Sequence, residues 1–291
     1  IICYAHIRKK LKLSGTSKQL AASWEKDAKT ALNLKRKKSC KTKVDKGKDW
    51  LNCLGMKMVW IPGEGNSDYK ETGRRYTKHR SEGFWVSATE VTQSQWKKIM
   101  GANPLNPWGD VCSWFGATDS LAVETYFPND KARVGSSKPI VDVPWHDCLE
   151  FCRRLSRIEG VNYTIPTELE WVRALGCKGD YGESINSYAW NKENAKNIMD
   201  VGLKRPNKYG IFDLLGNSAE YCLDFWQPKF GVNSISRKWH QGYMDDDMLL
   251  EFVCVRGGSV KDELDSVALD KRQRCNIGGN EFAGFRIVAH K

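Results

Sequence analysis

The sequence has no long apolar run. Its uninterrupted apolar stretches are only a few residues long, whereas a membrane-spanning helix needs about 20 mostly apolar residues, so no such helix is expected. Proline is also scarce, at 9 of 291 residues, while 12 Trp and 25 Gly are present. This composition is typical of an ordered, loop-rich globular protein and not of a disordered chain.

Clustered metal ligands are missing as well. The 5 His residues are too scattered to form a His-x-x-x-His pair. Cys148 and Cys152 lie four apart on one expected helical face, but no second pair or His cluster completes a zinc site. We therefore predict no metal and no cofactor. Most of the 10 cysteines are interpreted as small buried hydrophobic residues, with one or two disulfides if the protein is exported.

Charge is concentrated at the N-terminus. Residues 1–50 hold 15 Lys and Arg against 4 Asp and Glu, and the remaining 241 residues hold 31 of each sign. Such a basic arm fits binding to nucleic acid or to an anionic membrane surface, or a solvated pair of basic helices. The neutral remainder argues against nucleic-acid binding by the main domain, because phosphate binding leaves a basic surface excess.

Composition divides the chain into two parts. Residues 1–50 are predicted to be a basic, partly helical extension, and residues 51–291 a single α+β domain that opens on a strand at 58–61. The first three residues, Ile-Ile-Cys3, fit a lipoprotein remnant with a lipidated cysteine, or equally an arbitrary start of the chain. If the extension is only a tether, we expect the main domain to fold without it.

Three helices are marked by their caps and periodicity. Thr92 with Gln95 predicts a capping box, and the helix that it opens ends before Gly101. Apolar residues at helical spacing predict a second helix over 146–159. Thr167 with Glu170 predicts a third helix that stops near Gly176. Strands are expected at 253–257 and 284–288, and Gly257-Gly258 suits a tight crossing because glycine adopts backbone angles closed to other residues.

Several short sequence blocks occur along the chain in the same order as in one known protein family. They are Met-Val-Trp-Ile-Pro-Gly at 58–63, Thr-Glu-Val-Thr at 89–92, and the blocks at 139–151, 163–171, 206–220, 256–259 and 284–288. Together these blocks resemble the formylglycine-generating enzyme (sulfatase-modifying factor) family, over about residues 55–291. The resemblance implies an α+β domain of the C-type lectin fold, loop-rich with few short helices and strands.

The cysteine pair of the enzymes is missing. In the family, two cysteines just after Arg-Gly-Gly-Ser carry out copper-dependent oxidation, but here residues 260–267 contain none. Thiolate is the nucleophile and soft-metal ligand, and neither aspartate nor valine replaces it. Cys275 is single and lies beyond the paired positions, and Cys254 is expected to face the core. The related iron-dependent sulfoxide synthases need three histidines, and the extension has one. We predict no catalytic residues.

Asn217-x-x-Glu220 matches a calcium-binding loop of some family members. Asn and Glu supply hard oxygen ligands for that ion. The alternative is a turn at Asn217 with Glu220 hydrogen-bonded to the backbone. The sequence leaves both open.

The polar segment 259–283 indicates where a ligand binds. It is bracketed by expected scaffold strands, and an aromatic and acidic stretch at 239–247 precedes it. Adaptable polar and aromatic residues on a rigid frame are typical of a binding surface, although a solvent-facing loop with no ligand has the same composition. The arrangement is similar to the variable proteins of diversity-generating retroelements, a group that includes a Treponema variable protein.

This resemblance, together with the cost of about 1–3 kcal/mol for an unpaired buried polar group, predicts one exposed ligand-binding face. Its residues are Trp239, His240, Asp245, Asp246, Asp262, Glu263, Asp265, Ser266, Gln273, Arg274, Asn276 and Asn280. Arg272 is excepted, since it matches a scaffold arginine of the family and is expected to be partly buried.

The resulting hypothesis is a non-enzymatic, ligand-binding protein on a bacterial cell surface, with an outer-membrane lipid anchor and an unknown protein or cell-surface ligand. One alternative is a degenerate or active formylglycine-generating-type modifying enzyme. Another is a structural or regulatory domain of a larger assembly that makes its contact through the basic arm.

Overall fold

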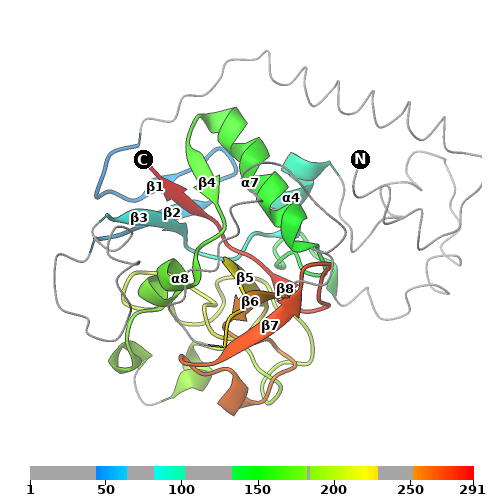
Figure 1. Ribbon diagram of the computed structural model, residues 1–291. Coiled ribbons are helices and arrows are strands. Elements are labelled where there is room, and N and C mark those ends of the chain that lie inside the picture. The colour runs from blue at the N-terminus through cyan, green and yellow to red at the C-terminus, as the bar shows by residue number, and fades with distance from the viewer. Residues whose placement is uncertain (1–43, 64–81, 102–132, 182–183, 229–251) are drawn as a thin grey trace, which may run out of the picture. The chain divides into compact units, whose positions relative to one another are not determined.

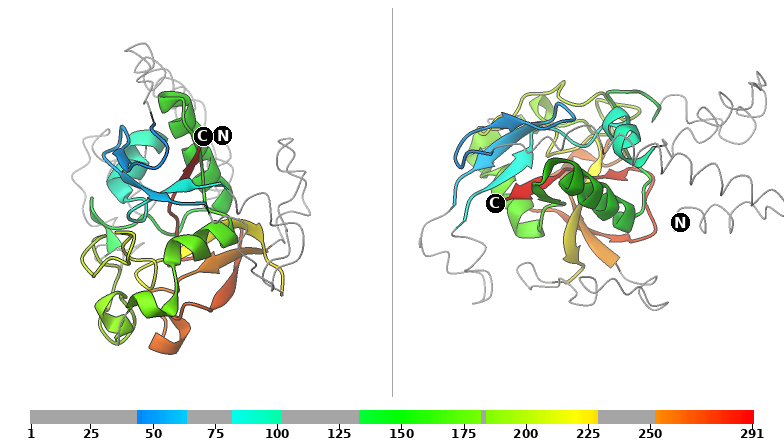
Figure 2. Two further views of the ribbon diagram at one scale, coloured as in Figure 1. Left: turned by 90° about the vertical axis from the view of Figure 1, so that its left-hand side faces the viewer. Right: turned by 90° about the horizontal axis from the view of Figure 1, so that it is seen from above.

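Two β-sheets carry the fold in the computed structural model, which describes residues 44–63, 82–101, 133–181, 184–228 and 252–291. One sheet has the strand order β1-β2-β3-β9-β4 and the other β7-β6-β5-β8, and the two occupy different halves of the domain (Figures 1 and 2). The strands are β1 Trp50–Leu51, β2 Lys57–Ile61, β3 Phe84–Ser87, β4 Asn162–Thr164, β5 Ala219–Phe225, β6 Phe252–Arg256, β7 Arg272–Asn276, β8 Ala283–Gly284 and β9 Val288–His290.

The helices of the described residues are short except for one. They are α4 Gln93–Met100, α7 Trp145–Glu159 and α8 Glu168–Leu175, with 3-10 turns η3 Lys178–Tyr181, η4 Ile185–Ser187 and η7 Leu264–Ser266. Few short helices combined with short strands confirm the predicted α+β class. No described helix has the length and apolarity required to cross a membrane.

The predicted helix boundaries are confirmed. Thr92 and Thr167 each form a complete capping box, with Gln95 and Glu170 as their respective partners. The helix α7 begins at Trp145, one residue earlier than expected, and ends at Glu159, followed by the C-cap residue Gly160, whose φ of 73° is left-handed. Side chains at i and i+4 lie on one helical face, and accordingly Cys148 and Cys152 are both buried.

The five-stranded sheet unites segments from both ends of the domain. β3 pairs with β2 on one side and with β9 on the other, which confirms that residues 58–61 and Val288 share a sheet. The strand expected over 284–288 is wrong, however. Gly284 belongs to β8 of the other sheet, and residues 285–287 lie outside both strands.

The physical reason is that the chain crosses here from one sheet to the other. β8 pairs parallel with β5, whereas β9 pairs antiparallel with β3 and β4. In between, the Ile287 carbonyl accepts from Ser87 N at 2.9 Å and the Phe285 carbonyl accepts from Val91 N at 2.9 Å. The crossing is therefore held by loop hydrogen bonds and not by a ladder.

The four-stranded sheet separates two hydrophobic clusters. Residues directly opposite in antiparallel strands share a face, so the pairs Tyr221↔Val255 and Val255↔Gln273 put these three side chains on one side. Tyr221 and Val255 pack in the cluster that contains α7, while Cys222 and Cys254 pack on the other side in the cluster that contains Trp171 of α8. Both faces of this sheet are thus covered.

Described residues before position 51 also pack against the domain. Val44 and Trp50 pack against the core, β1 starts at Trp50, and Trp85 Nε1 donates to the Lys48 carbonyl at 2.8 Å. Most of the predicted extension, residues 1–43, lies outside the described residues.

Candidate ligand-binding site

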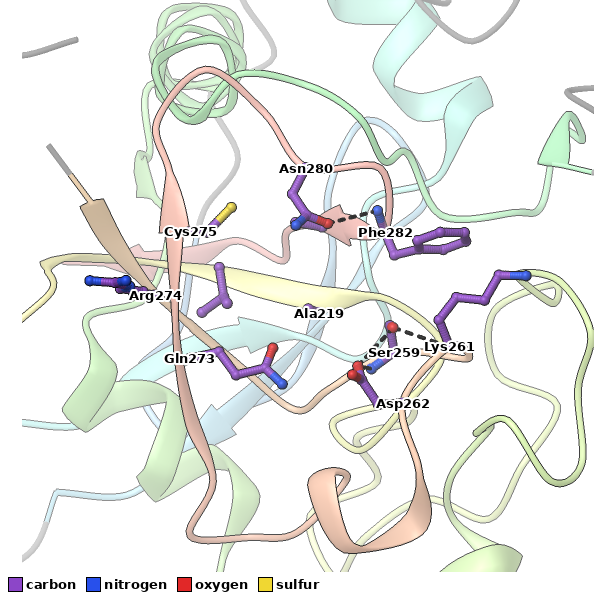
Figure 3. A pocket seen from close by; sticks show the side chains of 11 residues that line it. Ala219, Ser259, Lys261, Asp262, Gln273, Arg274, Cys275, Asn280 and Phe282 are labelled. Atoms are coloured by element: carbon purple, nitrogen blue, oxygen red, sulfur yellow. Dashed lines mark hydrogen bonds between the residues drawn. The ribbon is translucent and has the colours of Figure 1, made fainter. Parts of the chain in front are cut away.

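A hollow of about 220 Å³ lies at the β7 edge of the four-stranded sheet. It lies on the sheet face that carries Tyr221 and Val255, which is the inner face. It is lined by Ala219, Val255, Ser259, Lys261, Asp262, Gln273, Arg274, Cys275, Asn280, Phe282 and Ala283. Figure 3 shows these residues around it.

Strand alternation decides which β7 side chains face the hollow. Successive side chains on a strand point to opposite faces, so Gln273 and Cys275 share the inner face with Tyr221, whose hydroxyl lies 3.7 Å from Cys275 Sγ. Arg274 points the other way (Figure 3), and its guanidinium lies over the Phe252 ring at 4.8 Å. Arg274 therefore lines the hollow without aiming its charge into it.

The crossing after β6 shapes the lower wall. Gly257 and Gly258 have φ of 88° and 69°, and a Cβ on Gly257 would lie 2.6 Å from the Leu214 carbonyl oxygen. The predicted need for glycine at this crossing is thus confirmed. Ser259 follows directly, and both its backbone N–H and its Oγ donate to Asp262 Oδ2, at 2.7 and 2.8 Å.

An aromatic ring with two cations closes one side. Phe282 lies between Arg133 and Lys261, whose charged groups are 5.0 and 5.3 Å from its centroid. Arg133 is ion-paired with Glu281 at 3.0 Å, and Lys261 Nζ donates to the Lys196 carbonyl at 3.0 Å. Both cations therefore already have partners within the protein.

The lining includes one thiol, that of Cys275. It is 4% exposed, and burial raises its pKa above the usual value. Because the thiolate and not the thiol is the reactive form, this cysteine is poorly suited to nucleophilic or redox chemistry at neutral pH.

The predicted site residues are distributed unevenly. Trp239, His240, Asp245 and Asp246 lie outside the described residues, and the other eight are exposed or half-buried. Four of those eight line the hollow, namely Asp262, Gln273, Arg274 and Asn280.

The other four predicted residues do not line the hollow. Glu263 forms an ion pair with Lys192, and Asp265 and Ser266 lie on η7. Asn276 Oδ1 accepts from Gly278 N at 2.8 Å and so stabilises the turn after β7. These four are surface residues beside the hollow and not part of it.

Sequence reasoning missed the apolar lining and part of the wall. Ala219, Val255 and Ala283 lie on three different strands, and Phe282 with Ser259 flank the hollow from two loops. Alternation along 253–257 could have indicated Val255, but the meeting of these strands is a tertiary property.

Two structural expectations concern residues beside the site. Arg272 is half-buried as predicted, and its Nε and Nη2 donate to Glu168 at 2.5 and 2.8 Å. Asn217 and Glu220 are both fully buried. Glu220 Oε2 accepts from Trp171 Nε1 at 2.7 Å, and Asn217 Oδ1 accepts from Met199 N at 2.9 Å. This favours the turn interpretation over the calcium loop, but the partners of the Glu220 carboxylate are the side chains of Trp171 and Arg286 and not the expected backbone groups.

Within the described ranges, no group of three or more His, Cys, Asp or Glu side chains is arranged to hold a metal ion. The chemistry that the hollow offers is hydrogen bonding and apolar contact.

The comparisons with known proteins agree on the scaffold. Residues 52–291 match the sulfatase-modifying factor enzyme 1-like domain. The Treponema denticola variable protein 1 covers 86% of this chain over 100% of its own length, with a TM-score of 0.58 and 20% identity. PvdO from Pseudomonas aeruginosa has the same TM-score and coverages, at 19% identity. At such identities the likeness shows the fold alone, which is the predicted C-type lectin-like one.

Curated relatives are matched over part of their lengths. The chaperone protein LppX of Paenibacillus barcinonensis is 26% identical over 176 residues, which are 49% of this chain and 62% of LppX. The serine/threonine-protein kinase pkn1 of Chlamydia pneumoniae is 27% identical over 157 residues, 52% of this chain and 24% of the kinase. The matched region spans less than two thirds of either relative.

Proposed function

Since residues 52–291 belong to the sulfatase-modifying factor enzyme 1-like family, we propose that this chain uses the family scaffold for non-enzymatic ligand binding, as a variable protein of a diversity-generating retroelement. The observation that carries the proposal is the hollow. Its Gln273 and Asn280 side chains stand on a rigid two-sheet frame, and its one thiol is buried and protonated.

The chemistry of the wall supports binding over catalysis. Oxidation by this family's mechanism needs a cysteine pair, yet the segment after Ser259 supplies none. Cys254 is 0% exposed on the opposite face of the sheet, so it does not provide a second thiol to Cys275.

The position of the hollow also suits diversification. Apart from the buried Ser259, its polar lining residues are exposed or half-buried, and substitutions at such positions usually change stability by less than about 0.5 kcal/mol. The likeness in fold to the Treponema variable protein supports the same interpretation.

The test is a binding screen with a site variant. Wild type and the triple variant Gln273→Ala/Arg274→Ala/Asn280→Ala are applied to arrays of immobilised glycans and extracellular proteins. We expect at least one target to bind wild type and to lose at least tenfold in affinity with the variant, while the melting temperature changes by at most about 2 °C. A matched triple variant away from the hollow, Arg153→Ala/Arg154→Ala/Arg157→Ala on the exposed face of α7, should bind normally.

Two results contradict the proposal. One is a screen in which every target that binds wild type binds the hollow variant with equal affinity. The other is oxidation of cysteine to formylglycine in a sulfatase-derived peptide in the presence of copper, which would favour the modifying-enzyme alternative.

We further propose display on the bacterial cell surface through a lipid at Cys3. The bacterial relatives are compatible with this location. Protease treatment of intact cells should degrade the protein, and Cys3→Ser should release it from the membrane fraction. Protection from protease in intact cells would contradict surface display.

A further inference from the structure

Two uncharged carboxamide side chains face into the hollow, whereas its charged residues only border it. Gln273 points inward from β7, and Asn280 reaches over from the loop that precedes β8 (Figure 3). The Gln273 amide forms no hydrogen bond with any described residue, and Asn280 uses only its Oδ1, which accepts from Phe282 N at 3.0 Å. Both carboxamides therefore have free hydrogen-bonding capacity at the hollow.

The charged groups do not compete for this space. Lys261 Nζ is bonded to the Lys196 carbonyl, and the Arg274 guanidinium covers Phe252 on the other face of the sheet. Asp262 remains at the wall, where Ser259 donates twice to its Oδ2. The hollow thus offers no free cation to an anionic ligand and places a carboxylate beside it, so an anion entering here would lose water without compensation.

The lining also contains an apolar part. Ala219, Val255 and Ala283 contribute small aliphatic surfaces, and these three residues are at most 6% exposed. A methyl or methylene group fits such a surface, whereas a polar group there would lack a partner.

We infer that the hollow binds an uncharged carboxamide group with a short aliphatic neighbour, the amide pairing with Gln273 and Asn280 and the aliphatic part resting on Ala219, Val255 and Ala283. A carboxamide carries one acceptor and at least one donor, which is the complement of another carboxamide. The inference rests on the proposed binding function and names its ligand chemistry.

The size of the hollow limits what enters it. Its volume of about 220 Å³ is below the range of about 300–1,000 Å³ that is usual for whole small-molecule ligands. The hollow therefore accommodates one chemical group of a larger ligand and not the whole ligand. Two sources present the required group, the side chain of Gln or Asn in a peptide and the N-acetyl group of an amino sugar.

The experiment uses the full chain and four small probes. Propionamide, which reproduces the glutamine side chain, and N-acetylglucosamine carry the amide in the two forms. Propionate and glucosamine replace it by a carboxylate and an ammonium, and neither retains an amide. The readouts are the side-chain amide resonances of Gln273 and Asn280 in NMR titrations and the Kd derived from them.

We expect one carboxamide probe to shift both side-chain resonances and to bind at least tenfold more tightly than its charged counterpart. Gln273→Met keeps the length of the side chain and removes the amide, and it should weaken that probe at least tenfold. Gln227→Met is the matched control outside the hollow and should leave the Kd unchanged. The source is the peptide if propionamide binds and the amino sugar if the N-acetyl sugar binds.

The proposal is overturned if a charged probe binds as tightly as its amide partner, or if neither amide probe moves the Gln273 resonance. The array screen distinguishes failure of the carboxamide proposal from failure of the proposed binding function. If array targets bind through Gln273 but the carboxamide probes do not, the ligand chemistry is wrong and the binding function stands. If no array target depends on the hollow, both fail.

Discussion

Arg286 and Glu220 form an ion pair in the interior of the domain. Both side chains are 0% exposed, and Arg286 Nη2 and Nε donate to the two carboxylate oxygens at 2.5 and 2.6 Å. Arg286 Nη1 also donates to the Ser87 carbonyl at 3.1 Å. One guanidinium thereby ties β3, β5 and the crossing before β9 together.

Removing one partner of this pair should destabilise the domain strongly. Arg286→Met leaves the Glu220 carboxylate buried and uncompensated, and a cost of about 3–5 kcal/mol is expected. Urea denaturation measures the loss. The double variant Glu220→Gln/Arg286→Met keeps an acceptor for Trp171 and removes both charges of the pair, so it should be more stable than Arg286→Met alone. Equal stability of the two variants would show that loss of packing, and not the charge, dominates.

Buried Asp224 makes stability depend on pH. Burial raises its pKa to about 6, against the hydrogen bond that its Oδ2 accepts from Glu168 N at 2.6 Å. The unfolded value is about 3.9, so the native state holds the proton more tightly. The contribution to stability is therefore complete below about pH 4 and is lost as the pH rises through about 6.

Asp224→Asn should remove this dependence. Relative to the variant, wild type should lose on the order of 2–3 kcal/mol in the free energy of unfolding between about pH 4 and pH 7. Urea titrations of both proteins across that range measure the difference. Asp265→Asn, an exposed carboxylate, should run parallel to wild type. Parallel curves for Asp224→Asn would contradict the prediction.

At the scale of single residues, sequence reasoning predicted those with a local signature. Arg272 and the Gly257-Gly258 crossing were recognised from their positions in a motif. The buried carboxyl groups of Glu90 and Asp213 beside Glu220 were not, because a carboxylate in the sequence looks the same whether solvent or Arg286 surrounds it. Their burial depends on contacts across many residues, such as Asn217 Nδ2 to Glu90 Oε2 at 3.0 Å.

At the scale of elements, α8 depends on its first turn. Thr167 Oγ1 accepts from Glu170 N at 3.2 Å, and Glu170 Oε2 accepts from Thr167 N at 2.8 Å. Thr167→Ala should cost about 1 kcal/mol, because an N-terminal N–H loses its acceptor. Chemical denaturation measures this, and Thr167→Ser, which retains the hydroxyl, should recover most of the loss. An alanine variant as stable as wild type would mean that tertiary contacts alone hold the turn.

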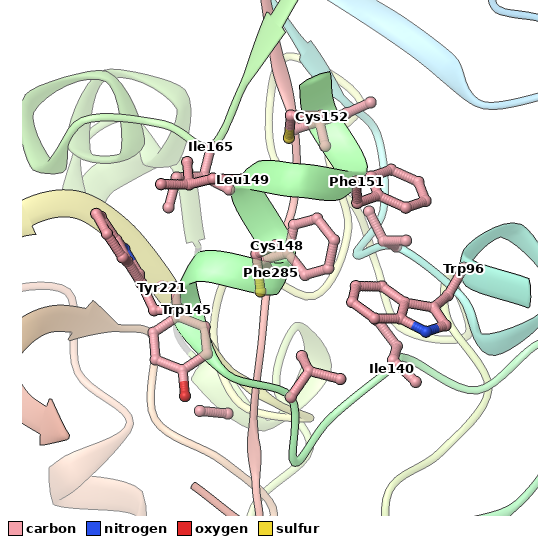
Figure 4. Packing of buried hydrophobic residues seen from close by; sticks show 14 of the residues in the cluster. Trp96, Ile140, Trp145, Cys148, Leu149, Phe151, Cys152, Ile165, Tyr221 and Phe285 are labelled. Carbon is pink, nitrogen blue, oxygen red and sulfur yellow. The ribbon is translucent and has the colours of Figure 1, made fainter. Parts of the chain in front are cut away.

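The buried face of α7 explains why this helix could be predicted from the sequence. Trp145, Cys148, Leu149 and Cys152 face the core, where Phe151 stacks on Trp96 with centroids 5.8 Å apart (Figure 4). Burial raises the pKa of both thiols, so they act as small apolar side chains. Helical periodicity and caps are local signals. The split between β8 and β9 is not local, because two short strands in one apolar run differ only in the sheet that each joins.

At the scale of the whole molecule, the boundary of the domain is testable. Asp49 Oδ1 accepts from Trp60 N at 2.9 Å, and Trp50 pairs with Met58. A chain that starts at Lys41 should unfold as cooperatively as the full chain and at the same midpoint.

A chain that starts at Asn52 should lose about 2 kcal/mol or more, since Trp50 no longer packs. Thermal and urea unfolding of both truncated chains measure this. Equal stability would place the boundary where the sequence alone suggested it, and loss of cooperativity from Lys41 would assign the first 40 residues to the core.

The candidate site was predictable only in outline. The polar segment between two scaffold strands indicated the region, and Asp262, Gln273, Arg274 and Asn280 do line one hollow. Which side chains face inward depends on the register Val255↔Gln273, and a shift by one residue would turn Arg274 inward instead. That register is fixed by packing of the whole sheet.

The crossing at residues 285–287 has a consequence for the order of events during synthesis. Ile287 N bonds to Ser87 Oγ across 200 positions of sequence, and β9 sits between β3 and β4. A ribosome that has synthesised the chain as far as residue 280 therefore carries a nascent domain whose five-stranded sheet lacks the strand between β3 and β4. Closure must wait for the last strand, and contacts of such long sequence separation form slowly. The newly made chain spends that interval with two open strand edges, which is when a chaperone or an export factor has access to it.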